Sequence, residues 1–184
     1  NSTLSGNSAI GSWAEGGGIS MSGQSAPAVE VTVRNSTLSG NHASGESNGG
    51  GGGAITAGGG GLYVDNSTLS GNWATGVRGA GGAIVATGGG LLVGNSTLSG
   101  NWAEGDEGGF GGGIFNLTSE IFIWNTILNA GQSGANLYQY EDEYESDPSP
   151  VLFHSLGYNL SSDDGGGFLT DLTDQINTDP LLGE

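Results

Sequence analysis

The side chains that could do chemistry in this sequence include a cluster of carboxylates. Glu104, Asp106 and Glu107 lie within four residues of one another, in a glycine-rich stretch. Hydrolysis of a glycosidic bond by two carboxyl groups needs them at a fixed separation, and a glycine-rich loop offers no rigid support for that. His42 and His154 have no evident nucleophile partner, so they give no sign of covalent catalysis.

Basic residues are too few for eliminative cleavage of a polysaccharide. That reaction needs a basic proton acceptor and clustered carboxylates on Ca²⁺, and the sequence has only Arg34 and Arg78, at unrelated positions relative to the sequence repeat. A net charge of −17 would also repel a polyanionic substrate. We therefore expect no catalytic residues and a protein that is not an enzyme.

Two acidic turns, at residues 105–108 and 162–165, offer oxygen ligands for a cation. Neither turn has the spacing of an EF-hand loop or the glycine- and aspartate-rich nonapeptide of calcium-binding β-rolls. We interpret both as solvated acidic loops. No metal and no cofactor is expected.

Aromatic residues at matching repeat positions form a candidate carbohydrate platform. Trp73 and Trp102 each follow the second Asn of a repeat copy, and His42 holds the same place one copy earlier. Stacked rings can bind the face of a sugar, but rings also stack on each other for stability alone. Both interpretations stay open on the sequence.

The composition excludes several classes of protein. Of 184 residues, 40 are Gly, none is Cys, and two are Lys or Arg against 19 Asp and Glu. A basic groove for nucleic acid is therefore excluded, docking on anionic membranes is disfavoured, and no apolar run is long enough for insertion into a bilayer. The charge is concentrated in residues 93–184, which carry −15 of the total of −17.

A repeat organises most of the chain. The heptapeptide Asn-Ser-Thr-Leu-Ser-Gly-Asn starts at residues 1, 35, 66 and 95, and a degenerate copy starts at residue 125. The spacings of 34, 31, 29 and 30 residues are typical of solenoid repeats. Between copies, Gly-Gly or Gly-Ala is followed by Ile, at Ile19, Ile55, Ile84 and Ile114.

Alternation of period two before each copy indicates strands rather than helices. The residues four and two positions before the first Asn are apolar in every case: Val31 and Val33, Leu62 and Val64, Leu91 and Val93, Ile121 and Ile123. The heptapeptide Leu and the Ile after each glycine pair should form further internal columns. The sequence thus predicts an all-β parallel β-helix, with about six coils and three short strands per coil. Residues 1–184 form one domain, with regular coils in 1–131 and irregular acidic coils and loops in 132–184.

The first Asn of each copy is expected at a sharp corner between two strands. Asn tolerates the left-handed backbone that such a corner needs. The side chains should turn inward and hydrogen-bond along the axis as a structural ladder, formed by Asn35, Asn66, Asn95 and Asn125. The second Asn of each copy, at 7, 41, 72 and 101, should close the strand and open a loop.

Two outward columns differ in character. Thr3, Thr37, Thr68 and Thr97, beside Ser5, Ser39, Ser70 and Ser99, make a hydroxyl face that could bind ice or sugar or be ordinary strand surface. The second column, three residues before the first Asn, is apolar for an exposed face. We expect Tyr63, Leu92 and Phe122 to form an interface covered by a loop, by the Tyr-rich segment 138–144 or by a neighbouring molecule. The acidic segment Glu141–Asp147 should lie outside the helix as a loop.

Two stretches resemble known bacterial proteins. Leu-Ser-Gly-Asn-x-Ala at 69–74, followed by Gly-Gly-Ala-Ile at 81–84, resembles the repeat of polymorphic outer-membrane proteins. The run at 156–160 and the Asn-Thr-Asp-Pro-Leu-Leu-Gly at 177–183 are similar to surface proteins of the choice-of-anchor Q type. These resemblances imply a right-handed parallel β-helix on a secreted or surface-attached bacterial protein, where the chain usually continues past this segment into an anchor.

The leading hypothesis is a non-enzymatic structural protein, extracellular or attached to the bacterial cell surface, that self-assembles head to tail into a filament. Contact between unlike ends does not close on itself. The alternative is an adhesin or carbohydrate-binding β-helix that uses Trp73, Trp102 and His42, and a second alternative is a polysaccharide lyase or hydrolase. The expected partners are copies of the same chain, head to tail or lateral, and an extracellular glycan, with no nucleic acid and no direct membrane insertion.

Overall fold

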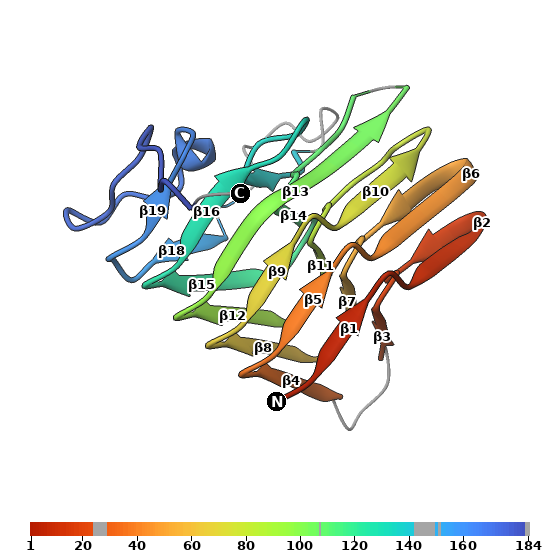
Figure 1. Cartoon of the computed structure of the whole chain (residues 1–184), viewed down its shortest axis with the longest axis horizontal. Helices are drawn as coiled ribbons and strands as arrows, with labels where there is room; N and C mark the ends of the chain where they lie inside the picture. Colours follow the sequence, from red (N-terminus) through yellow and green to blue (C-terminus); the bar gives the residue numbers. More distant parts are fainter. Residues whose placement is uncertain (24–28, 107, 142–149, 151, 183–184) are drawn as a thin grey trace.

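The chain forms a parallel β-solenoid of about five turns, in which strands lie across a common axis and coil follows coil from β1 to β19 (Figure 1). The computed structural model describes residues 1–23, 29–106, 108–141, 150 and 152–182. The prediction of an all-β parallel β-helix is confirmed, with about five turns in place of about six. Within the described ranges, no helix is long and apolar enough to cross a membrane.

The first three coils have four strands each. These are β1 (Thr3–Ser5), β2 (Ser8–Glu15), β3 (Ile19–Ser22) and β4 (Glu30–Arg34); β5 (Thr37–Ser39), β6 (His42–Gly51), β7 (Ile55–Gly58) and β8 (Gly61–Asp65); and β9 (Thr68–Ser70), β10 (Trp73–Gly76), β11 (Ile84–Thr87) and β12 (Gly90–Gly94). The later coils contain β13 (Thr97–Gly105), β14 (Ile114–Asn116) and β15 (Glu120–Trp124), then β16 (Ile127–Ala130), β17 (Leu137–Gln139) and β18 (Phe153–Ser155), and finally β19 (Leu160–Ser161) with the 3₁₀ turn η1 (Gly165–Gly167).

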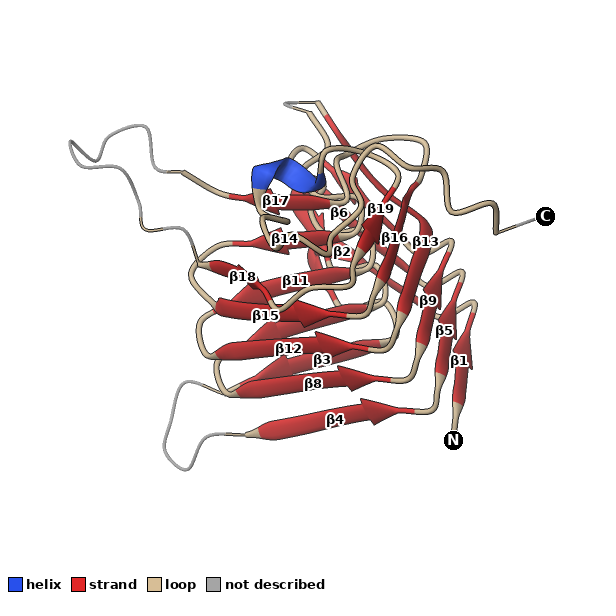
Figure 2. Cartoon of the chain, turned by 90° about the vertical axis from the view of Figure 1, so that its left-hand side faces the viewer, coloured by secondary structure: helices blue, strands red, loops and turns tan. Residues whose placement is uncertain are grey.

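Equivalent strands of successive coils pair in parallel and build three sheets. Two have five strands, in the orders β4-β8-β12-β15-β18 and β3-β7-β11-β14-β17. The third has nine, because β13 pairs with the β1-β5-β9 series, with β10-β6-β2 and with β16, which in turn pairs with β19. The register places repeat-equivalent residues opposite each other, for example Leu62 opposite Leu91. Figure 2 shows the β4-β8-β12-β15 side of the solenoid.

The residues after the second Asn form strands, which corrects the expectation of a loop there. The first three coils therefore have four strands each, whereas the coils β13–β15 and β16–β18 have the expected three. His42 lies opposite Trp73, and Trp73 lies opposite Trp102. A glycine with positive φ precedes the second Asn, as in Gly40 (φ 59°) and Gly71 (φ 58°). Because glycine adopts this conformation without a Cβ clash, the chain bends there and pairing continues in a new direction.

The apolar columns predicted from the sequence form the core. Buried members are Leu38, Leu69, Leu98 and Leu128; Ile55, Ile84 and Ile114; and Leu62, Leu91 and Ile121. In the first coil, Leu4, Ile19 and Val31 are partly buried and pack against this core. Burying one Leu or Ile side chain contributes about 1.5–3 kcal/mol. Because the columns run from coil to coil, each coil is stabilised mainly by its two neighbours.

The first Asn of each copy turns the corner with its backbone as predicted, but its side chain points outward. The φ angles are 51°, 48°, 52° and 46° at Asn35, Asn66, Asn95 and Asn125, and all four residues are exposed. Asn66 donates to Asn35 at 2.6 Å and Asn125 donates to Asn95 at 2.8 Å. Asn95 instead donates to Asp65 at 2.8 Å, so these bonds form an interrupted surface chain. The expectation of an inward ladder at this position is wrong.

Two other columns supply the buried polar bonds. The residue after the corner faces inward: the Ser67 hydroxyl donates to the Asp65 carbonyl at 2.9 Å and accepts from the Ser36 N–H at 3.1 Å. The second Asn of the heptapeptide is buried at Asn41, Asn72 and Asn101 and exposed at Asn7 in the first coil, and all four are linked by side-chain hydrogen bonds along the axis. The continuous ladder along the axis is therefore formed by the second Asn of each copy.

The C-terminal segment covers one end of the core. Phe168 stacks on Phe153 with ring centroids 4.6 Å apart, and Leu169 is buried. Asp163 accepts hydrogen bonds from the Asn136 N–H at 2.7 Å and the Gly165 N–H at 2.9 Å. Burial by itself raises the pKa of Asp163, but these bonds, with others from side chains, outweigh it and hold the pKa below its ordinary value. An ionised Asp163 thus ties the covering segment to the last coils.

Candidate functional site

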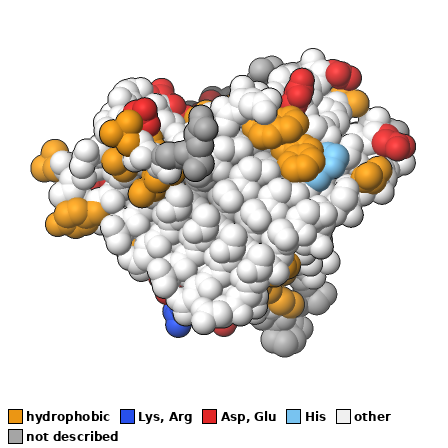
Figure 3. Space-filling view, viewed as in Figure 1, with side chains coloured by type: hydrophobic (Ala, Val, Ile, Leu, Met, Phe, Trp, Pro, Cys, Tyr) orange, Lys and Arg blue, Asp and Glu red, His pale blue; other side chains and the backbone are white. Residues whose placement is uncertain are grey.

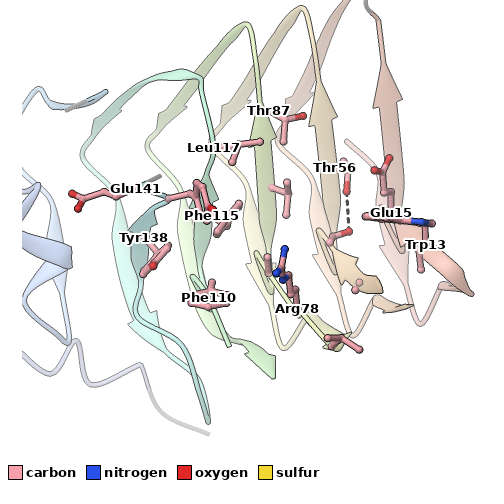
Figure 4. Close-up of a pocket in the computed structure, with 18 residues that line it drawn as sticks. Trp13, Glu15, Thr56, Arg78, Thr87, Phe110, Phe115, Leu117, Tyr138 and Glu141 are labelled. Carbon is pink, nitrogen blue, oxygen red and sulfur yellow. Dashed lines mark hydrogen bonds between the residues drawn. The ribbon is translucent and has the colours of Figure 1, made fainter. Parts of the chain in front are cut away.

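A groove of about 960 Å³ lies along the outer face of the β3-β7-β11-β14-β17 sheet. Trp13 and Glu15 lie at one end, and Tyr138 and Glu141 lie at the other (Figure 4). The lining residues come from the first coil through to the fifth. With neighbouring strands about 4.8 Å apart, four steps give the groove a length of about 19 Å.

The parallel register builds both the floor and one wall of the groove. Thr56, Val85, Phe115 and Tyr138 lie opposite one another along the floor. Gly51, Ala80 and Phe110 are linked by single bridges along the wall. The four floor residues come from four successive coils, and the three wall residues come from three successive coils. The stacking of the coils therefore brings them into one surface.

Aromatic rings cluster at the C-terminal end of the groove. Phe115 and Tyr138 are stacked with centroids 5.8 Å apart and planes at 9°, and Phe110 lies 5.2 Å from Tyr138 at 49°. Tyr140 adds a fourth ring 6.5 Å from Phe115 and is 44% exposed. At the other end Trp13 is 72% exposed. Exposed rings collected in a concave surface are typical of a ligand site.

Charged groups are few in the groove. Glu15 and Glu141 mark its two ends, and Arg78 lies between them on one wall (Figure 4). The Thr56 hydroxyl donates to the Gly51 carbonyl at 2.8 Å, which fixes floor to wall. The middle of the groove is therefore formed mainly by apolar groups, glycines and hydroxyls.

Sequence reasoning missed this groove. Its signal lies in the residue after the Ile of each glycine-pair mark, which reads Ser20, Thr56, Val85 and Phe115 and so becomes larger and more apolar along the chain. Tyr138 continues the same column. The Tyr-rich segment 138–144 was one of the expected covers for Tyr63, Leu92 and Phe122, but Tyr138 and Tyr140 lie in the groove instead.

The predicted platform residues form an aromatic stack. His42 and Trp73 have centroids 4.6 Å apart with planes at 20°, and Trp73 and Trp102 are 6.0 Å apart with planes at 5°. Figure 3 shows a histidine beside a hydrophobic cluster on this face. Burial lowers the pKa of His42, whose Nε2 lies 3.1 Å from the Thr75 hydroxyl. Because Trp73 has a ring neighbour on each side, the stack offers a ligand mainly ring edges.

The apolar outward column is continuous with one further ring. Tyr63 lies opposite Leu92, Leu92 lies opposite Phe122, and Phe122 lies opposite His154. Phe122 and His154 stack with centroids 4.8 Å apart, and Tyr63 is 39% exposed. The column thus presents an apolar strip along one side of the solenoid.

The two acidic turns lie in different surroundings. Glu104 and Asp106 line a depression of about 300 Å³ with Glu46, Ser44 and Thr75, and Glu107 lies outside the described residues. Over the part of the chain that the structure describes, no three His, Asp or Glu residues are grouped to hold a metal ion.

The second acidic turn is structural: Asp163 accepts the bonds given above, and Asp164 accepts from the Gly166 N–H at 2.9 Å. Of the predicted acidic loop, only Glu141 is described, and it is exposed. The rest of Glu141–Asp147 lies outside the described residues.

No family model, no curated protein and no solved structure matches this chain. Function therefore has to be inferred from the chemistry of its surfaces.

Proposed function

We propose that this protein is a non-catalytic carbohydrate-binding β-solenoid, located outside the bacterial cell, and that the groove holds an extended glycan. The observation that carries the proposal is the groove itself, with an aromatic cluster at one end and the exposed Trp13 at the other. A site of about 19 Å accommodates several consecutive units of a linear ligand.

The chemistry of the lining suits a saccharide. Sugar rings present C–H faces, which pack against aromatic rings, and hydroxyls at their rims, which need polar partners. Tyr140 and Trp13 supply exposed ring surface, and the carboxylates of Glu15 and Glu141 can accept hydrogen bonds from sugar hydroxyls. Aromatic side chains with a few placed polar groups are the usual lining of such sites.

The charge of the protein selects among glycans. Carboxylates mark both ends of the groove, and the net charge of the chain is −17. A polyanionic glycan would be repelled on approach. The ligand class is therefore a neutral or amino-substituted linear glycan.

The same carboxylates argue for binding without cleavage. Glu15 lies in the first coil and Glu141 follows β17 in the fifth, about 19 Å away along the axis. Glycoside hydrolysis by two carboxyl groups needs a separation of about 5–10 Å. No other carboxylate lines the described groove.

The proposed location rests on the repeat. The resemblance of residues 69–84 to polymorphic outer-membrane proteins, and of the C-terminal run to choice-of-anchor Q proteins, supports a secreted or surface-attached bacterial protein. A glycan-binding groove suits that setting, because polysaccharides are abundant on and around bacterial surfaces.

A glycan array followed by titration calorimetry tests the proposal. We expect wild-type protein to bind neutral or amino-substituted oligosaccharides, and Phe115→Ala and Trp13→Ala each to weaken binding at least tenfold. Trp102→Ala is the matched control, because it removes a large ring from the other aromatic stack and should leave affinity unchanged. Absence of binding across the array, or equal loss with Trp102→Ala, would contradict the proposal.

Self-association is a second candidate function, favoured by the apolar strip of Tyr63, Leu92, Phe122 and His154. Phe168 and Leu169 cover the C-terminal end of the core, which favours a lateral contact over a head-to-tail one. Sedimentation velocity should then show species larger than the 18.2 kDa monomer, and Tyr63→Ser with Leu92→Ser should return them to monomer. A single monomeric species at high concentration and high salt would exclude lateral assembly.

A further inference from the structure

One face of the solenoid carries no charge at all within the described residues. It is formed by β1, β5, β9 and the start of β13, whose outward side chains are Thr3, Thr37, Thr68 and Thr97 beside Ser5, Ser39, Ser70 and Ser99. Figure 3 shows this face as the broad white centre of the view, with charged side chains only at its rim. Most of the 19 acidic residues lie after residue 92, and none of the few charged residues of the earlier coils is on this face.

The hydroxyls form a regular two-column array. Thr37 lies opposite both Thr3 and Thr68, Thr68 lies opposite Thr97, and the Ser column has the same register without a shift. Neighbouring hydroxyls therefore repeat at about 4.8 Å along the axis, and the two columns are separated by about 6.6–6.8 Å along the strands. The array spans four coils and ends at β16, where Ile127 and Asn129 take these positions.

The hydroxyls of this array have almost no partners within the protein. Among the described residues, the only hydrogen bond that any of the eight makes is one that Ser99 accepts from Asn129 at 3.4 Å. By contrast, the inward hydroxyl of Ser96, one residue before Thr97, donates to the Gly94 carbonyl at 2.7 Å. The outward hydroxyls therefore face solvent, where first-shell waters can bridge neighbouring hydroxyls of the array.

The border of the array is flat on the side toward the aromatic stack. Gly6, Gly40, Gly71 and Gly100 follow the Ser column, all with positive φ. A Cβ at Gly6, Gly40 or Gly71 would meet no atom within 4 Å, so no side chain rises above the hydroxyls along this edge. The glycine edge therefore leaves the two hydroxyl columns uncovered on this side.

We propose that this hydroxyl face binds ice. Its two repeats are close to those of oxygen atoms on the prism faces of ice, so waters held by the hydroxyls can join the lattice. The Thr methyl groups order water beside them as apolar surface does, and the absence of charge avoids strongly hydrated ions that would break the lattice. With eight hydroxyls over four coils, the activity is modest, and it is independent of the glycan groove on another sheet.

Ice shaping, thermal hysteresis and ice recrystallisation test this proposal on the whole protein. We expect faceted crystals and a hysteresis that rises with protein concentration. Thr68→Tyr and Thr97→Tyr should each reduce the hysteresis severalfold, because a large ring lifts the surface from the lattice. Thr68→Val keeps the shape of the side chain and removes the hydroxyl, so it should reduce the hysteresis less than Thr68→Tyr does. Circular dichroism of each variant would reveal a loss of hysteresis that is caused by misfolding.

Thr32→Tyr is the matched control, because Thr32 is an exposed outward Thr on β4 whose neighbour in the next coil is already Tyr63. It should leave hysteresis unchanged, and so should Phe115→Ala in the groove. Round, unfaceted crystals with no hysteresis at the highest soluble concentration would overturn the proposal. An equal reduction by Thr32→Tyr and Thr68→Tyr would also overturn it, because the activity would then not belong to this face.

Discussion

The side-chain oxygen of Asn72 accepts two hydrogen bonds from Asn41, one from the backbone N–H at 3.0 Å and one from the side-chain amide at 2.9 Å. Asn72 in turn donates to the Leu38 carbonyl and to Asn101. It is completely buried. One side chain therefore satisfies polar groups of two adjacent coils inside the solenoid.

Replacing Asn72 with Ala should lower the free energy of unfolding by about 2–5 kcal/mol, because each buried polar group left without a partner costs about 1–3 kcal/mol. Chemical denaturation measures the effect. The matched control is the exposed corner residue Asn66: Asn66→Gly should be nearly neutral, and Asn66→Ala should cost only the left-handed strain of about 1–2 kcal/mol. A larger loss at Asn66 than at Asn72 would show that the surface chain stabilises the coils more than the buried ladder.

Two glycines without positive φ should respond to Ala in opposite ways. A Cβ at Gly82 would meet the backbone oxygens of Gly112 and Trp102, each at 2.4 Å, whereas a Cβ at Gly90 would meet nothing within 4 Å. We expect Gly82→Ala to separate neighbouring coils and lower the melting temperature strongly. Gly90→Ala should be neutral or stabilise by about 0.4–1 kcal/mol, because it restricts the unfolded chain. Equal melting temperatures for the two variants would contradict this account.

Acid should weaken the attachment of the C-terminal segment through Asp163. The pKa of its carboxyl group is held below the ordinary value in the folded protein. The stability it contributes is therefore complete above the pKa of the unfolded chain, near 3.9, and is lost as the pH falls through that value toward the lower folded pKa. Asp163→Asn should show a smaller decrease in unfolding free energy between about pH 5 and pH 3 than the wild type. Parallel curves for the two proteins would rule out this role.

His42 should also make the protein less stable in mild acid. Burial lowers the pKa of His42 below 6.5 in the folded protein. Below pH 6.5 the unfolded chain therefore binds a proton more readily than the folded one, and stability falls until the folded pKa is passed. His42→Gln should remove part of the decrease between pH 7 and pH 5, as measured by thermal unfolding. An NMR titration that places the pKa of His42 above 6.5 would contradict the expected direction of the pKa shift and of the change in stability.

The core could be predicted because apolar residues alternate without interruption along the strand before the first Asn of each copy. Val64 and Leu62 precede the corner on one strand, so both face inward, and Leu69 follows one corner later. The inward or outward direction of the side chains could not be followed past the two left-handed residues of each copy. After Asn66 and again after Gly71 the alternation is reset, so counting could not show that Asn66 points outward and Asn72 inward.

Only the floor of the groove shares a repeat position, so the groove as a whole could not be predicted. Trp13 lies near the end of β2, Phe110 lies in the connection between β13 and β14, and Phe115 lies on β14. Connections of unequal length decide which of these residues meet. The sequence indicated the strand that carries Phe115 but not β2, which carries Trp13, and the side chains come together only when the coils are stacked.

The parallel stacking has a mechanical consequence. The strands lie across the axis, so tension applied along the axis loads the hydrogen bonds of one coil boundary at a time. Each coil would then be expected to peel away separately, since it is held by its immediate neighbours alone. Releasing one repeat of 29–34 residues would lengthen the tether by about 10 nm, given roughly 3.3–3.6 Å per extended residue. A molecule of this design yields to a pull in small equal steps and dissipates energy at each of them.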